Sequence, residues 1–195
     1  MSAHPKTSEK ILLATIDLMA EKGYDGTTTK EIALAAGVNE VTLFRHFGTK
    51  EKLLEAAFSR FHYGNEMTKL FNEGLRGNLR EDLLTVSRTY HSIMNQNRKL
   101  ISIALKGSST LPDSVLQEAS RNPKHLKSLL ADYLTKMSSE GKANASNPDI
   151  QAMSFMWMNY GAFISGLNAK EATSGDTLNE FIEESVSIFA KALRP

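Results

Sequence analysis

Two short stretches of the chain carry hydroxyl and ammonium groups at positions where phosphate could bind. Thr28, Thr29 and Lys30 stand at the predicted start of one helix, and Lys50 opens another. Free backbone N–H groups and the positive end of the helix dipole bind phosphate at such positions. We therefore expect these side chains to bind a nucleic-acid backbone. Capping alone would also account for Thr28, and an ordinary solvated lysine would account for Lys50.

A second group of side chains, between these two stretches, could read base edges. The group lies on one predicted helix and consists of Glu40, Val41, Thr42 and Arg45. Glu40 can accept a hydrogen bond from cytosine N4, and Arg45 can reach guanine O6 and N7 or a phosphate. Val41 and the Thr42 methyl group suit a thymine methyl. A simpler interpretation of Glu40 also stands, because the helix dipole stabilises a carboxylate at a helix start without any DNA.

Capping signals predict the helices that must position these groups. Thr28 and Glu31 have the spacing of a capping box, which starts a helix at the next residue. Gly37 ends that helix, and Asn39 caps a second one. Gly48 ends the second helix, and Thr49 caps a third. Two short helices joined by so tight a turn form a helix-turn-helix, whose second helix enters the major groove of DNA.

The same segment carries a longer pattern. Its residues are Gly37-Val38-Asn39, Thr42-Leu43-Phe44-Arg45-His46-Phe47, Lys50-Glu51 and Leu53-Leu54, preceded by Ile11, Ala14, Leu18, Gly23, Tyr24 and Thr27-Thr28-Thr29. This pattern resembles the DNA-binding signature of the tetracycline-repressor (TetR) family over roughly residues 8–58. The resemblance implies a homodimer that binds a palindromic operator in double-stranded DNA, with half-sites about one helical turn or somewhat more apart.

The resemblance also assigns roles to two aromatic residues of the second helix. It implies that His46 binds a phosphate and that Phe44 occupies a DNA-contacting position. The family usually has tyrosine at the position of Phe44, and the missing hydroxyl removes about 0.5–1.5 kcal/mol of one phosphate contact. Asn39 stands where the family often has serine, and asparagine caps a helix equally well.

Composition restricts the classes of function. The 195-residue chain has a net charge of +1, and residues 1–60 hold eight Lys or Arg and eight Asp or Glu. Attraction to DNA must therefore come from local placement of cations, since an architectural DNA-binding protein would be strongly basic. The absence of cysteine and the dispersal of five histidines predict no metal site, and we expect no cofactor and no enzyme activity. Without a signal peptide or a membrane-spanning run, a cytoplasmic protein is expected.

Helical periodicity extends over the whole chain and predicts an all-α fold. Beyond the helix-turn-helix, helices are expected at about 8–22, 50–72, 79–96, 98–107, 113–120, 123–140, 148–169 and 176–193. We expect an N-terminal three-helix DNA-binding domain at residues 1–52. Residues 53–195 would then form a helical domain for ligand binding and dimerisation.

The predicted helix at 148–169 is apolar on nearly all sides. Its own domain can cover one side, and a second copy of the chain is the natural cover for the other. Together with the last helix it would form a four-helix interface between two subunits. The residues expected there are Met153, Trp157, Tyr160, Gly161, Ile164, Phe181 and Phe189. A buried core helix in a monomer is the alternative interpretation.

By resemblance, the helices from about residue 50 to 169 would enclose a pocket for a small-molecule effector. The candidate lining residues are Tyr90, Met94, Tyr133, Phe155, Asn159 and Phe163. Plain core packing explains them as well, because methionines and aromatic residues at helical spacing need no ligand. Asn159 stands out as an amide among apolar residues that needs a hydrogen-bond partner. The apolar bias of the set indicates a hydrophobic or aromatic effector.

The sequence therefore predicts a ligand-responsive transcriptional regulator, in the simplest form a repressor that leaves its operator when it binds the effector. A helical protein-interaction module and an architectural DNA-binding protein without a ligand switch are the alternatives. Saturation of the apolar surface by self-association would exclude the first alternative. Sequence-independent binding with a steep salt dependence would support the second.

Overall fold

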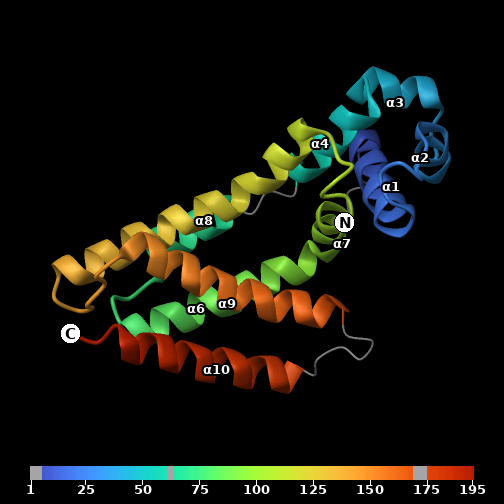
Figure 1. The fold of residues 1–195 in the computed structure, drawn as a ribbon. Helices are drawn as coiled ribbons and strands as arrows, with labels where there is room; N and C mark the ends of the chain where they lie inside the picture. The colour runs from blue at the N-terminus through green and yellow to red at the C-terminus, as the bar shows by residue number, and fades with distance from the viewer. Residues whose placement is uncertain (1–5, 61–63, 169–174) are drawn as a thin grey trace, which may run out of the picture. The chain divides into compact units, whose positions relative to one another are not determined.

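The computed structural model describes residues 6–60, 64–168 and 175–195, and within these ranges the fold is helical without strands (Figure 1). The elements are α1 (Thr7–Lys22), α2 (Thr29–Ala35), α3 (Glu40–Phe47), α4 (Lys50–Arg60), α5 (Gly64–Lys69), the π-helical turn η1 (Leu70–Gly74), α6 (Leu79–Gln96), α7 (Arg98–Lys106), α8 (Asp113–Ser139), α9 (Pro148–Asn168) and α10 (Gly175–Ala192). The prediction of an all-α chain with an N-terminal helix-turn-helix is confirmed.

The helices belong to two compact units. The first unit takes the described parts of residues 1–62 together with residues 97–121, and so contains α1 to α4, α7 and the start of α8. The second unit takes the described parts of residues 63–96 and 122–195, and contains α5, η1, α6, the rest of α8, α9 and α10. A functional boundary after residue 52 stays a prediction.

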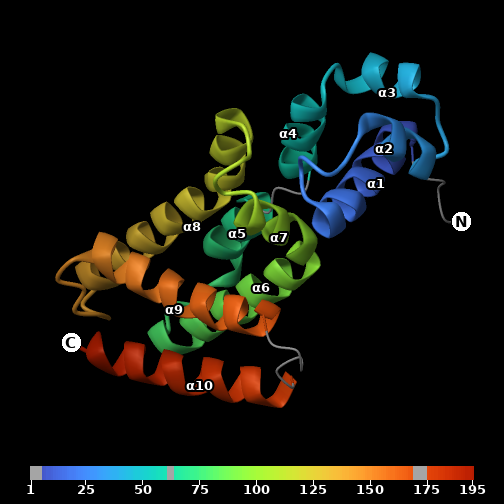
Figure 2. The ribbon, with the colours of Figure 1, turned by 45° about the vertical axis from the view of Figure 1, so that its right-hand side comes forward.

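In the first unit, α1 is the helix against which the others pack. It contacts α2, α4 and α7, while α2 also packs against α3 (Figures 1 and 2). Its fully buried side chains join those of the helix-turn-helix in one core, which includes Ile11, Met19, Ile32, Leu43, Leu53 and Leu54. Burial of each such side chain stabilises the fold by about 1.5–3 kcal/mol. This core fixes the positions of α2 and α3 within the unit.

Two glycines end the short helices of the helix-turn-helix. Gly37 has φ 69° and Gly48 has φ 78°, in the left-handed region that a β-carbon disfavours. The Gly37 and Val38 N–H groups donate to backbone carbonyl groups of α2 at 3.1 and 3.0 Å, which terminates that helix. The two helix stops predicted from the sequence are confirmed.

In the second unit, α6, α9 and α10 pack side by side (Figures 1 and 2). Their shared core is built from apolar side chains spaced three or four residues apart, among them Leu83, Ile93, Ala152, Phe155, Ile182 and Val186. The rings of Phe155 and Phe189 lie 5.2 Å apart between their centroids and join α9 to α10. One side of α9 is therefore committed to the core of its own unit.

A buried carboxylate holds the turn before α6. Asp82 is 2% exposed and accepts hydrogen bonds from the Arg76 and Gly77 N–H groups, each at 2.8 Å. The Tyr133 hydroxyl on α8 donates to the same carboxylate at 2.8 Å. Three donors thus compensate the burial of this charge and connect α8 to the start of α6.

The break predicted between residues 120 and 123 was wrong, because α8 continues through Pro123 as one helix. An internal proline removes one backbone hydrogen bond and costs roughly 3 kcal/mol. Buried side chains on both sides of it, Val115 before and Leu126 and Leu130 after, favour a continuous helix and offset that cost. The helix predicted at 50–72 corresponds to α4, α5 and η1, and its residues 61–63 lie outside the described ranges.

Candidate functional site

The start of α2 is fixed by the predicted capping box, which is confirmed. The Thr28 hydroxyl oxygen accepts from the Glu31 N–H at 3.2 Å, and the Thr28 N–H donates to Glu31 Oε2 at 2.9 Å. Lys22 binds the other carboxylate oxygen at 2.8 Å. The hydrogen bond from Lys22, followed by those from Thr28, lowers the pKa of Glu31 from 4.5 to about 2. Thr28 therefore has a capping role, and its predicted phosphate contact stays a prediction.

The recognition helix α3 begins at a second local cap. Asn39 Oδ1 accepts from the Thr42 N–H at 2.8 Å and from the Thr42 hydroxyl at 2.7 Å. These bonds satisfy one of the free N–H groups at the helix start. They also orient Thr42 so that its hydroxyl proton points toward Asn39, which leaves the methyl group and the oxygen lone pairs for other contacts.

A hydrogen bond between two predicted DNA contacts joins α2 to α3. The Thr29 hydroxyl donates to Glu40 Oε1 at 2.5 Å. The sequence placed Thr29 among phosphate contacts and Glu40 among base contacts, and the structure brings the two side chains together. One oxygen of Glu40 is thereby committed to positioning, which fixes the carboxylate at the first turn of α3.

Lys50 makes contacts that its sequence position did not reveal. Its ammonium group donates to Tyr24 O at 2.9 Å and to Thr27 O at 3.2 Å, and it lies 4.2 Å from the centroid of the Tyr24 ring. The lysine thus ties the start of α4 to the loop before α2. Two of its three N–H donors are used in this way, so a phosphate contact would use the third.

The remaining predicted DNA contacts lie on the surface of the first unit. Lys30, Arg45 and His46 are exposed, and the apolar side chains of Val41 and Phe44 are 76% and 44% exposed. Apolar groups at such exposure are available for contact with a thymine methyl or with the sugar-phosphate backbone. The surface of α3 therefore presents both charged and apolar groups, and their contacts with DNA stay predictions.

Leu34 is a candidate contact that the sequence reasoning missed. It is 81% exposed on α2, whereas its neighbours Ile32 and Ala33 are buried. A leucine outside the buried stripe of a helix was the signal that could have identified it.

In the second unit, five of the six predicted ligand-binding residues are buried on two helices that pack together. They are Tyr90 and Met94 on α6 and Phe155, Asn159 and Phe163 on α9. The sixth, Tyr133, is only partly buried, donates its hydroxyl to Asp82 and packs edge-on against Phe71. Burial, followed by the interaction with Asp82, raises the pKa of Tyr133.

Two buried polar residues near this set were also missed. Ser87 and His91 on α6 are 0% and 3% exposed. Burial lowers the pKa of His91 and so favours the neutral ring. Their spacing of four residues, in step with Tyr90 and Met94 on the same buried face, was the available signal.

The predicted dimer residues fall into an exposed and a partly buried group. Met153, Trp157 and Phe181 are 39%, 62% and 37% exposed, and Gly161 is exposed with open space around its α-carbon. Tyr160, Ile164 and Phe189 are partly buried. Ile150 and Ile188, at 50% and 67% exposure, add to the apolar surface of α9 and α10. Exposed apolar side chains of this kind suit the predicted dimer interface, which stays a prediction.

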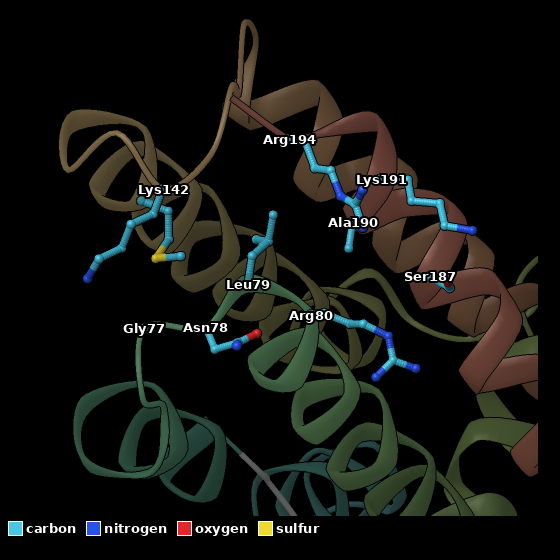
Figure 3. A pocket seen from close by; sticks show the side chains of 10 residues that line it. Gly77, Asn78, Leu79, Arg80, Lys142, Ser187, Ala190, Lys191 and Arg194 are labelled. Atoms are coloured by element: carbon cyan, nitrogen blue, oxygen red, sulfur yellow. The ribbon is translucent and has the colours of Figure 1, made fainter.

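A pocket of about 340 Å³ lies at the start of α6, whereas His91 is near the end of that helix (Figure 3). It is lined by the turn before α6, the loop after α8 and the end of α10. Arg80 is paired with Glu81 and Glu183. Figure 3 shows the ammonium groups of Lys142 and Lys191 directed to opposite sides. Lys142 is also paired with Glu140 at 2.7 Å, so two of the four cations that line the pocket already have carboxylate partners.

The fold and the first unit define a helix-turn-helix regulator, and comparison with known proteins gives the family. Residues 11–57 match the model of the bacterial regulatory proteins of the tetR family. The chain is 33% identical over 187 residues to the uncharacterized HTH-type transcriptional regulator YvkB of Bacillus subtilis, with 96% of this chain and 97% of YvkB covered. The chain therefore belongs to the tetR family of bacterial regulatory proteins. It is a DNA-binding transcriptional regulator and not an enzyme.

A further relative agrees with this assignment, and solved structures agree with the fold. The HTH-type transcriptional repressor Rv3405c of Mycobacterium tuberculosis is 27% identical over 185 residues, covering 95% of this chain and 88% of Rv3405c. The fold is similar to that of FadR from Bacillus subtilis in complex with stearoyl-CoA, with a TM-score of 0.74, 17% identity and coverage of 93% and 96%. It is also similar to that of PfmR from Thermus thermophilus, with a TM-score of 0.73, 17% identity and coverage of 93% and 97%.

Membrane-spanning helices and clustered metal ligands are both absent from the described residues. None of the helices within them is both long and apolar enough to cross a membrane. Among the same residues, no cluster of three or more His, Cys, Asp or Glu side chains is placed to hold a metal ion.

Proposed function

We propose that the chain is a homodimeric repressor that binds a palindromic operator and is released by a small apolar or aromatic molecule. The observation that carries the DNA-binding part is the exposed surface of α3, whose start is fixed by the Asn39 cap and by the Thr29–Glu40 hydrogen bond. Such prior fixing lowers the entropy cost of binding. Rv3405c is named a repressor, and IcaR of Staphylococcus aureus, 23% identical over 181 residues, is named a negative regulator.

The proposed DNA contacts divide into two classes. Phosphate contacts come from the starts of α2 and α4 and the end of α3, and are assigned to Thr28, Thr29, Lys30, His46 and Lys50. Phe44 has no donor for a phosphate and is assigned a contact of its ring with the DNA backbone. Base contacts come from the exposed side of α3, and are assigned to Glu40, Val41, Thr42 and Arg45. Phosphate contacts fix the register of the protein, whereas base contacts give sequence preference.

Substitutions that separate the two classes test this assignment on an operator selected from random DNA. Thr42→Ala should change preference at one base step while binding to unrelated DNA is unchanged. Lys50→Ala should weaken all sequences alike and reduce the salt slope by about one. Lys52→Ala is the matched control, because it removes an exposed cation of α4 without the two carbonyl contacts of Lys50. Unchanged operator binding in both Thr42→Ala and Lys50→Ala would contradict the placement of α3 on DNA.

The exposed apolar surface of α9 and α10 supports the homodimer. Trp157 is 62% exposed and stands between other exposed apolar positions of α9. The centroid of its ring lies 5.7 Å from that of the Tyr160 ring. Trp157→Glu should convert the dimer to monomer in sedimentation equilibrium, because a buried interface tryptophan commonly contributes roughly 2 kcal/mol or more. Leu105→Glu, on an exposed apolar position of α7, is the control and should leave the dimer intact. A wild-type monomer would contradict the proposal.

The effector is proposed to bind in the second unit between α6 and α9. The support is the burial of Tyr90, Met94, Phe155, Asn159 and Phe163 on helices that pack together, with Tyr133 at the edge of the set. A ligand can release DNA only if it binds one of two conformations more tightly. FadR, solved in complex with stearoyl-CoA, is a protein of similar fold that binds a ligand with an apolar chain.

A further inference from the structure

The buried faces of α6 and α9 carry polar atoms without partners. Ser87 and His91 share one face of α6, and Asn159 lies on the buried side of α9 at 3% exposure. Within the described part of the chain, Ser87 Oγ, both ring nitrogens of His91 and Asn159 Oδ1 have no hydrogen-bond partner. Four orphaned atoms on three buried side chains are unusual, because about 90% or more of such groups are satisfied.

These side chains offer a defined set of hydrogen-bonding groups. Asn159 Nδ2 donates to Phe155 O at 2.9 Å, so the amide oxygen is the free end and can only accept. A side-chain interaction with Asn159 that favours the protonated ring offsets part of the lowering of the His91 pKa by burial, so the two side chains face each other without a hydrogen bond of normal length. The neutral ring presents one N–H donor and one lone pair, and the Ser87 hydroxyl can donate or accept.

Core stability alone does not explain polar residues at these positions. A buried polar atom without a partner costs roughly 1–3 kcal/mol. The neighbouring positions on the two faces are aromatic or aliphatic, namely Tyr90, Met94, Phe155 and Phe163. Leucine or alanine in place of the three polar residues would avoid the cost, so a molecule that supplies the missing hydrogen bonds is the better explanation.

We propose that Ser87, His91 and Asn159 bind the hydroxyl group of a small uncharged effector, an alcohol or phenol whose apolar body lies against the surrounding aromatic and methionine side chains. The hydroxyl proton goes to Asn159 Oδ1, and the hydroxyl oxygen accepts from the His91 ring or from Ser87. A carboxylate has no proton for Asn159 Oδ1, and an ionised group finds no countercharge in the cluster. The inference rests on the proposed binding of an effector by the second unit.

Three related probes test the hydroxyl requirement by calorimetry on the full chain without DNA. Naphthol carries an apolar body and a hydroxyl, methoxynaphthalene lacks the proton, and naphthoate is charged. Naphthol should bind, and the other two should bind about tenfold more weakly or less, as expected for the loss of one hydrogen bond.

Variants locate the site. Ser87→Ala and Asn159→Leu should each weaken naphthol binding by about tenfold. Ser92→Ala, the same substitution as Ser87→Ala at an exposed position of α6, should leave binding unchanged. Without a ligand, Asn159→Leu should change the melting temperature little, because the loss of the bond from Nδ2 to Phe155 O is offset by removal of the unpartnered oxygen. A purely structural cluster would give a lower melting temperature and unchanged probe binding.

The inference is overturned if naphthol and methoxynaphthalene bind equally, if none of the probes binds the folded protein, or if the atoms hold only ordered water in the presence of naphthol. Because the measurement contains no DNA, it is independent of operator binding. A protein that binds an operator but no probe would overturn the hydroxyl site and leave the DNA-binding proposal intact. A protein that binds naphthol but no operator would do the reverse.

Discussion

The two units treat their polar side chains differently. In the first unit, the groups that set the helix-turn-helix have intramolecular partners, as in the bonds of Asn39 to Thr42 and of Lys50 to two carbonyl groups. Among the residues that the structure describes, all five buried side-chain atoms without partners belong to the second unit. Four of them are in the cluster of Ser87, His91 and Asn159, and the fifth is Asn122 Oδ1.

This difference agrees with the roles that we propose for the two units. A surface that reads DNA gains affinity when its helices are already held in place, because little order has to be created on binding. A site that responds to a ligand needs interactions that only the ligand completes, since equal affinity for two states shifts nothing. The caps of the first unit have their hydrogen-bond partners, as expected of a preorganised DNA-binding surface. The buried polar groups of the second unit lack them, as expected of a site that a ligand completes.

The largest expected effect tests whether the core of the first unit holds α3 in place. Leu43 is fully buried on α3, and Leu43→Ala should lower the free energy of unfolding by about 2–5 kcal/mol in denaturant titrations. Leu34→Ala, on the exposed side of α2, is the matched control and should change it by less than about 0.5 kcal/mol. Similar losses in both variants would mean that the packing of the first unit does not hold α3.

Asp82 belongs to the second unit but, unlike Ser87, His91 and Asn159, it is buried with hydrogen-bond partners. A substitution there tests whether those partners contribute to stability. Asp82→Ala leaves the Arg76 and Gly77 N–H groups and the Tyr133 hydroxyl without an acceptor. The expected loss in unfolding free energy is about 1.5–3 kcal/mol, and Asp82→Asn should keep part of it. A stable Asp82→Ala protein would show that hydrogen-bond satisfaction does not distinguish this site from the orphaned cluster.

The cap of α3 should have a smaller effect. Asn39→Ala removes the acceptor of the Thr42 N–H and hydroxyl, and should cost about 1 kcal/mol. Asn39→Asp keeps a capping oxygen and should restore most of the stability. If the two variants unfold at the same denaturant concentration, the cap does not hold the helix start.

The smallest expected effect is the pH dependence of the exposed Glu31 site. Its pKa in the folded state is about 2, below its ordinary value of 4.5, so its contribution is present above about 4.5 and is lost as the pH falls toward 2. The difference in melting temperature between wild type and Glu31→Gln should therefore shrink over this range. A difference that is constant with pH would mean that the carboxylate charge does not contribute to the capping box.

The sequence predicted those features that depend on neighbouring residues. The capping box of Thr28 and Glu31, the Asn39 cap and the glycine stops at Gly37 and Gly48 are confirmed because a few adjacent residues determine each of them. The exposed apolar side of α9 also followed from a helix with more apolar surface than one core can cover.

Features that depend on tertiary placement could not be predicted in this way. Pro123 signals a helix end locally, but packing on both sides of it keeps α8 continuous. The bond from Thr29 to Glu40 and the carbonyl partners of Lys50 join residues 11, 23 and 26 positions apart. The cluster of Ser87, His91 and Asn159 likewise requires the packing of α6 on α9.

The central claim is that α3 reads a palindromic operator from a dimer, and selection from random double-stranded DNA by the purified protein tests it most directly. At about physiological salt, the selected DNA should be enriched in an inverted repeat whose half-sites lie about one helical turn or somewhat more apart. No enrichment by a folded dimeric protein would contradict the claim, and Phe44, which lacks the usual tyrosine hydroxyl, would be the first position to examine.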